Sequence, residues 1–179
     1  MKSKNYLRMS KALFMTVKDL KDRSIIDGNT DADKLIHYIE VAQDIYIHQY
    51  LGTSLYDKIQ DLILNNTIDD AANSDYKYLR DTYLKPCLLW FTHIEYLPES
   101  MFTVNNGGLA RHRGENEDVI GYDEVDRLIS KALARADFYT QRLVEYLCEN
   151  SNLFPEYLNN SGADLDPNRD NNNFSSIVL

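Results

Sequence analysis

The sequence predicts a mainly α-helical protein: a bundle-like subunit of four to five helices, with one projecting loop or β-hairpin arm and an extended C-terminal tail. Two observations support this fold class. Apolar residues recur every three to four positions in successive segments between residues 31 and 150, which is the spacing of amphipathic helices. The stretches at about 98–122 and after 158 lack that spacing. With 179 residues the chain can bury a sizeable core, so we expect one helical domain over residues 1–158 and an extended or disordered tail over 159–179.

Residues 17–51 predict two helices. Thr16 precedes the sequence VKDLKDR as an N-cap, which gives a short helix over about 17–23. Thr30 or Asp31 caps a second helix, and Leu35 and Ile39 begin its apolar stripe.

A corner follows at residues 51–54, where the sequence LGTS interrupts the helical pattern. Gly52 is expected to end the second helix as a left-handed C-cap, and Thr53 or Ser54 to cap a third helix. Three tyrosines lie nearby, and a buried ring with a polar tip can fix the angle between two helices. We therefore interpret the corner as a structural joint rather than a chemical site. Its residues are Leu51, Gly52, Thr53, Leu55 and Tyr56.

Two longer helices follow. Residues 76–97 carry the most hydrophobic face of the chain, and a kink is expected at Pro86 because an interior proline lacks the N–H that the helix uses. Pro98 is expected to end this helix, since proline disfavours helical geometry in the residue before it. Residues 123–150 show the cleanest periodicity and predict a long helix, after which the sequence LFPEYL closes the domain.

Residues 98–122 are interpreted as the arm, and the segment after residue 158 as the tail. The runs MFTV and LARHR flank the sequence NNGG, and an Asn-Gly turn between two short extended runs is typical of a β-hairpin. The polar sequence NNSGADLDPNRDNNN predicts disorder, and the chain then reads FSSIVL. We expect the apolar residues of that last stretch to dock on a partner; a frayed end is the alternative. They are Phe174, Ile177, Val178 and Leu179.

The formal net charge of −9 argues against a protein that coats nucleic acid through many phosphate contacts. The charge is uneven: residues 1–23 carry seven cationic and two acidic side chains, whereas residues 31–75 carry nine acidic and two cationic ones. Four cations lie on one flank of the last long helix. We interpret them as a seam for an acidic neighbour, such as residues 31–75 of another copy; a solvated flank is the alternative. These cations are Arg127, Lys131, Arg135 and Arg142.

No pattern in the sequence predicts catalysis, a cofactor or a metal site. His93 and Glu95 have the H-x-E spacing of zinc deaminases, but the downstream P-C-x-x-C of that signature is missing. The acidic sequence DGNTDAD is followed by Tyr38 where a calcium loop needs glutamate, and it has Ala32 where the loop needs glycine. No apolar run approaches the roughly 20 residues of a membrane span. We therefore expect a protein that is not an enzyme, holds no cofactor and does not contact a membrane.

The sequence AQDIYIHQYLGTSLYDKI, at residues 42–59, resembles the head-tail connector proteins of tailed bacteriophages, also called adaptor or head-completion proteins. The first helices of that family carry an Ala-Gln pair, an Ile and a Leu-Gly-x-x-Leu-Tyr corner. The likeness continues through the helix that ends in YLPE, the NNGG arm and the closing sequence RLVEYLCENSNLFPEY, over roughly residues 12–158. It is greatest to proteins of phages that infect Bacteroidetes-type hosts, including crAss-like phages. The matching positions are Ala42, Gln43, Ile47, Leu51, Gly52, Leu55 and Tyr56.

This resemblance implies a structural virion protein, made in the cytoplasm of the host bacterium and located at the neck, below the portal. Subunits of the family are mainly helical and assemble into a ring, typically a dodecamer. The ring extends the DNA channel and joins the capsid to the neck or tail, and DNA passes through its lumen without sequence-specific binding. The implied partners are other copies of the chain, the portal protein and a downstream neck or tail protein. The family has no catalytic residues to carry over.

An alternative function is that of a DNA-packaging accessory protein of the small-terminase type. Its nucleic-acid contacts would be the basic N-terminus and the sequence ARHR, which contains Arg111 and Arg113. The acidic net charge counts against this function, and a salt-sensitive affinity for DNA would favour it.

Overall fold

The computed structural model describes residues 11–26, 30–100, 102–105, 108–111, 121–160 and 164–170. Within these ranges the protein is mainly helical, as the sequence predicted. The α-helices are α1 (Val17–Asp22), α2 (Ala32–Ala42), α3 (His48–Leu64), α4 (Ser74–Leu79), α5 (Lys85–Ser100), α6 (Tyr122–Glu149) and α7 (Pro155–Leu158). Short π-helical turns span Gln43–Ile47 and Arg80–Leu84, and 3₁₀ turns span Ala71–Asn73 and Ser151–Leu153.

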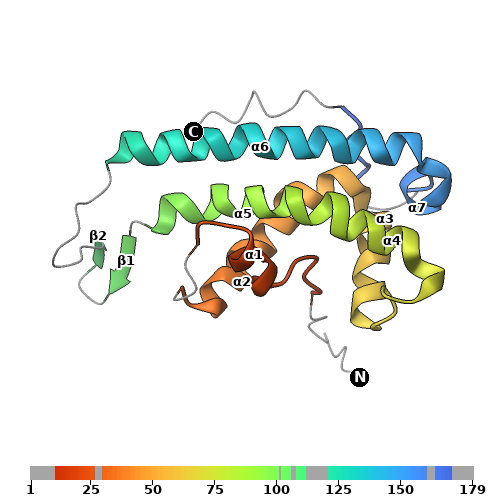
Figure 1. The fold of residues 1–179 in the computed structure, drawn as a ribbon, viewed down its shortest axis with the longest axis horizontal. Coiled ribbons are helices and arrows are strands. Elements are labelled where there is room, and N and C mark those ends of the chain that lie inside the picture. The colour runs from red at the N-terminus through yellow and green to blue at the C-terminus, as the bar shows by residue number, and fades with distance from the viewer. Residues whose placement is uncertain are drawn as a thin grey trace, which may run out of the picture.

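The helices α5 and α6 lie side by side and antiparallel, and together they form the long axis of the molecule (Figure 1). α2 also packs against α5. The contact surfaces are fully buried; they include Cys87 and Phe91 of α5 and Ala136 and Leu143 of α6. The apolar stripe predicted over residues 123–150 is therefore the buried face of α6, and removal of this apolar surface from water is the main stabilising contribution to the fold.

The predicted starts of the first two helices are confirmed. Thr16 and Asp19 form a capping box, in which the Asp19 N–H donates to Thr16 Oγ1 over 3.1 Å and the Thr16 N–H donates to Asp19 Oδ2 over 3.3 Å. Asp31 caps α2, because its Oδ1 accepts from the Asp33 N–H over 3.0 Å. These bonds satisfy N–H groups that have no partner within the helix.

Gln43, in the π-helical turn between α2 and α3, holds the segment that precedes α1. Its side chain is 1% exposed. Its Oε1 accepts from the Phe14 N–H over 2.8 Å, and its Nε2 donates to the Ala12 carbonyl and to the Tyr56 hydroxyl, both over 3.0 Å. Gln60 accepts from the Ala12 N–H over 2.7 Å. The glutamine of the Ala-Gln pair therefore fixes an irregular segment to the helical core.

The expected kink at Pro86 is replaced by a π-helical turn that comes directly before it. The Lys85 N–H donates to the Arg80 carbonyl, five residues back, at the end of the turn Arg80–Leu84. Pro86 is the second residue of α5, so its missing N–H falls where the α-helix restarts rather than within a regular ladder.

Pro98 does not end the helix as predicted, because α5 continues to Ser100. Proline only disfavours helical geometry in the preceding residue, and this one lies in the last turn, where a single hydrogen bond is lost. The Ser100 hydroxyl donates to the Leu97 carbonyl over 2.8 Å and satisfies one of the free carbonyls at this helix end.

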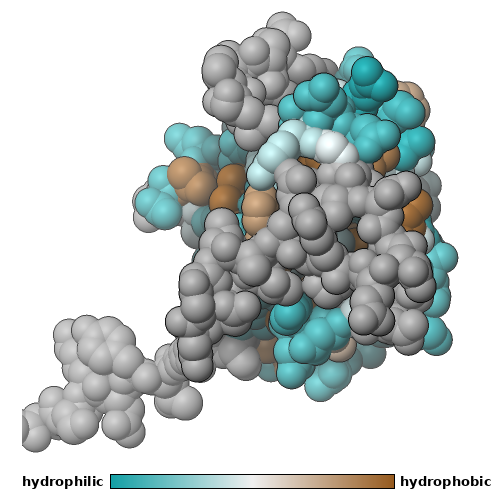
Figure 2. Space-filling view, turned by 90° about the vertical axis from the view of Figure 1, so that its left-hand side faces the viewer, coloured by the Kyte–Doolittle hydropathy of each residue, from teal (hydrophilic) through white to brown (hydrophobic). Residues whose placement is uncertain are grey.

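Two short strands, β1 (Phe102–Asn105) and β2 (Gly108–Arg111), lie between α5 and α6 in the sequence. They pair antiparallel, with Phe102 opposite Arg111 and Asn105 opposite Gly108, so that two residues lie between the strands. Figure 1 places them at the end of the molecule where α5 ends and α6 begins. Figure 2 looks at that end, where the described surface is mostly hydrophilic and apolar residues show only in small separate patches.

Candidate functional site

The predicted corner at residues 51–54 is a break inside α3, and Gly52 is its centre. Gly52 has φ 69° and ψ 161°. The positive φ agrees with the prediction, but the ψ value does not belong to a left-handed cap. This combination falls in a region of backbone space that is essentially restricted to glycine. A Cβ at this position would also lie 2.7 Å from Cγ and Cδ of Pro167, so glycine is required both by the backbone and by the neighbouring chain.

Residues 164–170 of the tail fill this break. In an uninterrupted helix the Thr53 N–H would donate to the Gln49 carbonyl. Here the Thr53 N–H donates to the Leu165 carbonyl over 3.0 Å, and the Gln49 carbonyl accepts from the Asn168 N–H over 2.7 Å. The Leu165 N–H donates in turn to Thr53 Oγ1 over 2.9 Å. The tail therefore replaces a helical hydrogen bond with bonds of its own, and residues 164–170 of the predicted extended or disordered tail are fixed to the helix.

Asn160 joins the tail to the corner. It is 7% exposed. Its Oδ1 accepts from the Ser54 N–H over 2.8 Å, and its Nδ2 donates to the Leu165 carbonyl and, over 3.0 Å, to Asp166 Oδ1. Nearby, the Arg169 guanidinium lies 5.1 Å from the centre of the Tyr157 ring and donates to the Tyr157 carbonyl over 3.0 Å. These contacts anchor both ends of the described tail segment.

The tyrosines around the corner act as the sequence predicted, as buried rings with bonded polar tips. Tyr46 stacks on Phe91 with a centroid distance of 4.2 Å, and its hydroxyl donates to Glu95 over 2.7 Å. The Tyr56 hydroxyl donates to Asp44 over 2.8 Å. Burial, together with these carboxylate partners, raises the pKa of Tyr46 and Tyr56 well above the ordinary value of 10. Both rings stay neutral near neutral pH, so their hydroxyls remain able to donate to Glu95 and Asp44.

The four cations predicted as a seam, which we call the cation row, are exposed along α6. They are Arg127, Lys131, Arg135 and Arg142. Within the described residues none of them lies in an ion pair. The Arg135 guanidinium lies 4.4 Å from the centre of the Trp90 ring, and that of Arg142 lies 5.7 Å from the Tyr83 ring. Cation–π contacts of this kind orient the guanidinium groups without neutralising them.

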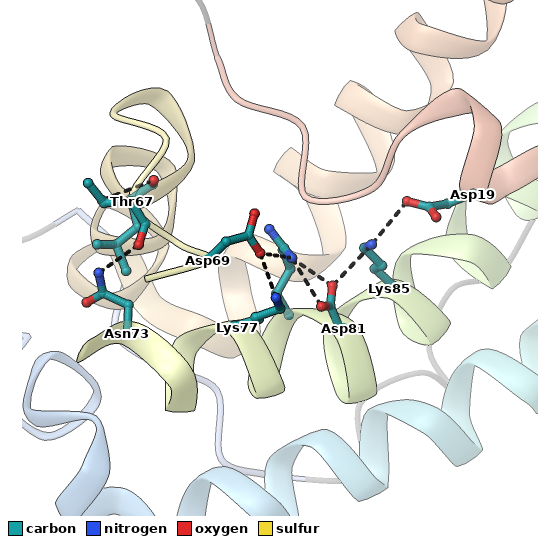
Figure 3. Close-up of polar contacts among 9 residues, drawn as sticks. Asp19, Thr67, Asp69, Asn73, Lys77, Asp81 and Lys85 are labelled. Atoms are coloured by element: carbon teal, nitrogen blue, oxygen red, sulfur yellow. Dashed lines mark hydrogen bonds and ion pairs between the residues drawn. The ribbon is translucent and has the colours of Figure 1, made fainter. Parts of the chain in front are cut away.

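Sequence reasoning missed a chain of alternating charges that joins α1, α4 and α5 (Figure 3). Lys85 Nζ lies 3.1 Å from both Asp19 and Asp81, and Arg80 Nε lies 2.8 Å from Asp81. Asp69 continues the chain and pairs with Lys77 over 3.0 Å. The i,i+4 spacing of Asp81 and Lys85 was a signal for one link, but the link to Asp19 spans distant parts of the sequence.

The ion pairs of this charge chain lower the pKa values of Asp81 and Asp69. Burial alone would raise the pKa of the Asp81 carboxyl, but the hydrogen bonds from Arg80 and Lys85 lower it below its usual 3.8. The hydrogen bond from Lys77 lowers the pKa of the exposed Asp69 carboxyl. These carboxylates therefore stay ionised into acidic solution and keep the chain of pairs closed.

His93 and Glu95, which have the H-x-E spacing of zinc deaminases, make contacts within the helical core. His93 is 2% exposed and its Nδ1 lies 2.8 Å from the Leu89 carbonyl, while Glu95 accepts from Tyr46. Burial lowers the pKa of His93. Among the described residues, no cluster of three or more histidine, cysteine, aspartate or glutamate side chains is arranged to hold a metal ion.

Of the remaining predicted interface residues, Arg111 alone lies in a described part of the chain. Arg111 is described only as the last residue of β2. Arg113, Phe174, Ile177, Val178 and Leu179 lie beyond the described ranges. The structure therefore joins the corner to the tail segment and places the cation row on an exposed flank of α6. The contacts of the arm side chains and of the apolar residues at 174–179 stay predictions.

Comparison with known proteins gives a family but no function. Over the described residues, no helix is both long enough and apolar enough to span a membrane. No curated protein and no solved structure matches the chain. A family model does match residues 47–166, a span that contains both the break at Gly52 and Leu165 of the tail. Because this span covers more than half of the sequence, the chain belongs to the family of unknown function DUF6712.

Proposed function

We propose that the protein is a structural virion subunit that forms a ring below the portal of a tailed bacteriophage, extends the DNA channel and joins the capsid to the neck or tail. The observation that carries this proposal is the cation row of α6. Like charges repeated on one helix repel one another, and the described chain pairs none of them. Acidic side chains of a neighbouring subunit would offset this repulsion, which is why the row favours self-assembly.

The charge of the whole chain supports the same function. A net charge of −9 leaves a negative surface in excess, and a negative lumen wall repels the phosphates of passing DNA. The subunit would thus present one cationic face to its neighbour, while the rest of its surface is acidic. The likeness of residues 42–59 to head-tail connector proteins supports the same function.

The hairpin and the end of the tail are the proposed contacts with components above and below the ring. β1 and β2 pair only with each other within the described residues, which suits an arm that gains packing from a partner. The apolar side chains of residues 174–179 would dock on the portal protein or on an adjacent subunit. Residues 164–170, held in the helix break, would set the point from which this docking segment starts.

The mass of the purified full-length chain, alone and mixed with the portal protein of the same phage, tests the proposal. We expect a ring of many copies, typically twelve, either alone or on the portal. A chain that stays monomeric in both samples contradicts the proposal. Titration with double-stranded DNA at low and high salt distinguishes the ring subunit from the alternative function. A strong affinity for DNA that falls steeply as salt rises would identify a packaging accessory protein instead.

A further inference from the structure

Two exposed stripes on different helices have the same spacing and opposite charge. On α6, Lys131, Arg135 and Phe138 follow one another at steps of four and three residues; we call them the cationic stripe. On α3, Asp57, Asp61 and Leu64 follow at the same steps; we call them the acidic stripe. Residues at these steps lie on one face of a helix, so each stripe presents two like charges and then one apolar side chain.

The cationic stripe is available for a partner. Lys131 and Arg135 are exposed, and Phe138 keeps 57% of its side chain in solvent although it is a large aromatic residue. Arg142 extends the stripe by one turn, with its guanidinium 5.8 Å from the centre of the Phe138 ring. Aromatic and arginine side chains together are the composition that dominates binding energy at protein interfaces.

The acidic stripe is equally available. Asp57 and Asp61 are exposed and take part in no ion pair within the described residues, and Leu64 is 39% exposed. Along the helix axis Asp57 and Asp61 are about 6 Å apart, and so are Lys131 and Arg135. The next step, from the second charge to the apolar residue, is about 4.5 Å on both helices. The two stripes therefore match in length and order.

We infer that the cationic stripe of one copy packs against the acidic stripe of a second copy, with α6 and α3 parallel. Lys131 then faces Asp57, Arg135 faces Asp61 and Phe138 packs on Leu64. This inference rests on the proposed ring, for which it names the contact between neighbours. Because the two stripes differ, the contact is head to tail, and repeated contacts of this type close into a ring when the rotation between copies allows it.

A second copy fits the cationic stripe better than nucleic acid does. Glu145 lies on the same flank of α6, where it accepts from Gln141 over 3.0 Å. A carboxylate at this position repels phosphates. A row of phosphates also has no equivalent of Leu64, so Phe138 would stay exposed or would need a base to stack on.

Charge reversal with mixing tests the contact on the full-length chain. One variant carries Lys131→Glu with Arg135→Glu, and the other carries Asp57→Lys with Asp61→Lys. Each variant alone places like charges opposite each other, so we expect loss of the wild-type oligomer in native mass spectrometry. In an equimolar mixture every contact again joins opposite charges, and we expect an oligomer of wild-type size with alternating copies.

Lys18→Glu with Lys34→Glu is the matched control, because it changes the net charge equally at two exposed cations of α1 and α2. We expect the control to keep the oligomer. Circular dichroism of each variant checks the fold, and recovery in the mixture excludes unfolding as the cause of the loss.

The outcomes separate the contact from the proposed function. If wild-type protein assembles and both reversed variants assemble alone to the same size, the ring stands and this contact is wrong. If the wild type never assembles, the ring and the contact fall together. If Lys131→Glu with Arg135→Glu removes an affinity for DNA and leaves the oligomer intact, the stripe binds phosphate and the inference is overturned.

Discussion

Gly52 shows how one residue can be fixed by two independent requirements. Its backbone angles are open to glycine alone, and its missing side chain leaves room for Pro167. Either requirement by itself would make a substitution costly. Together they explain why a flexible residue stands in the middle of a helix, where it otherwise costs about 1 kcal/mol relative to alanine.

We expect Gly52→Ala to lower the free energy of unfolding by about 3 kcal/mol, since strained backbone alone costs of order 1–3 kcal/mol and the new Cβ meets Pro167. Urea unfolding measures the change. Gly121→Ala is the matched control, because Gly121 has φ −72° and the nearest atom to its added Cβ is 3.9 Å away. Equal losses in the two variants would show that the break has no special requirement for glycine.

At the scale of elements, the charge chain of Figure 3 connects α1 with α5 and with the π-helical turn that precedes α5. Lys85 of α5 joins α1 through Asp19 and the preceding π-helical turn through Asp81. Its side chain is 20% exposed, so the pairs are only partly screened by water. The chain therefore contributes to how α1 sits on α5, and it does so through titratable groups.

We expect the stabilising effect of Asp81 to depend on pH. Its carboxyl has a lowered pKa in the folded protein, so its contribution is present above the ordinary value of 3.8 and is lost as pH falls through the lowered value. Asp81→Asn should therefore lower the unfolding midpoint at pH 7 and have little effect well below pH 3.8. Thermal unfolding across this pH range is the measurement. Asp126→Asn, an exposed acid of α6, should leave the profile unchanged; a pH-independent loss in Asp81→Asn would contradict the ion-pair explanation.

For the whole molecule, charge rather than apolar area dominates the proposed assembly. We expect the association of copies to weaken when salt rises from about 0.1 M to about 1 M, because the screening length falls from roughly 10 Å to roughly 3 Å. Sedimentation of the full-length protein at both salt concentrations measures the effect. Association that strengthens with salt would indicate an apolar interface and would argue against the cation row as the main contact.

Most of the helical framework could be predicted from the sequence. The contacts between segments that lie far apart in the sequence could not. The stripe of α6 and the capping box at Thr16 were predictable because each depends on residues within a few positions of one another. The interruption at Gly52 was predictable because glycine is a local signal. The ψ angle of Gly52 was not, since it depends on Pro167, more than one hundred residues later. Residues 164–170 have no apolar periodicity, so composition alone indicated disorder where backbone hydrogen bonds impose order.

The tail segment in the helix break also has a consequence for the order of folding during synthesis. Leu165 bonds to Thr53 across 112 positions, and a ribosome makes Thr53 first. While the intervening residues are being translated, the bonds that the tail and Asn160 make to Gln49, Thr53 and Ser54 cannot form, and an α-helical bond from the Thr53 N–H to the Gln49 carbonyl can take their place. The break at Gly52 can therefore take its final geometry only after Leu165 has been made, 112 positions after Thr53.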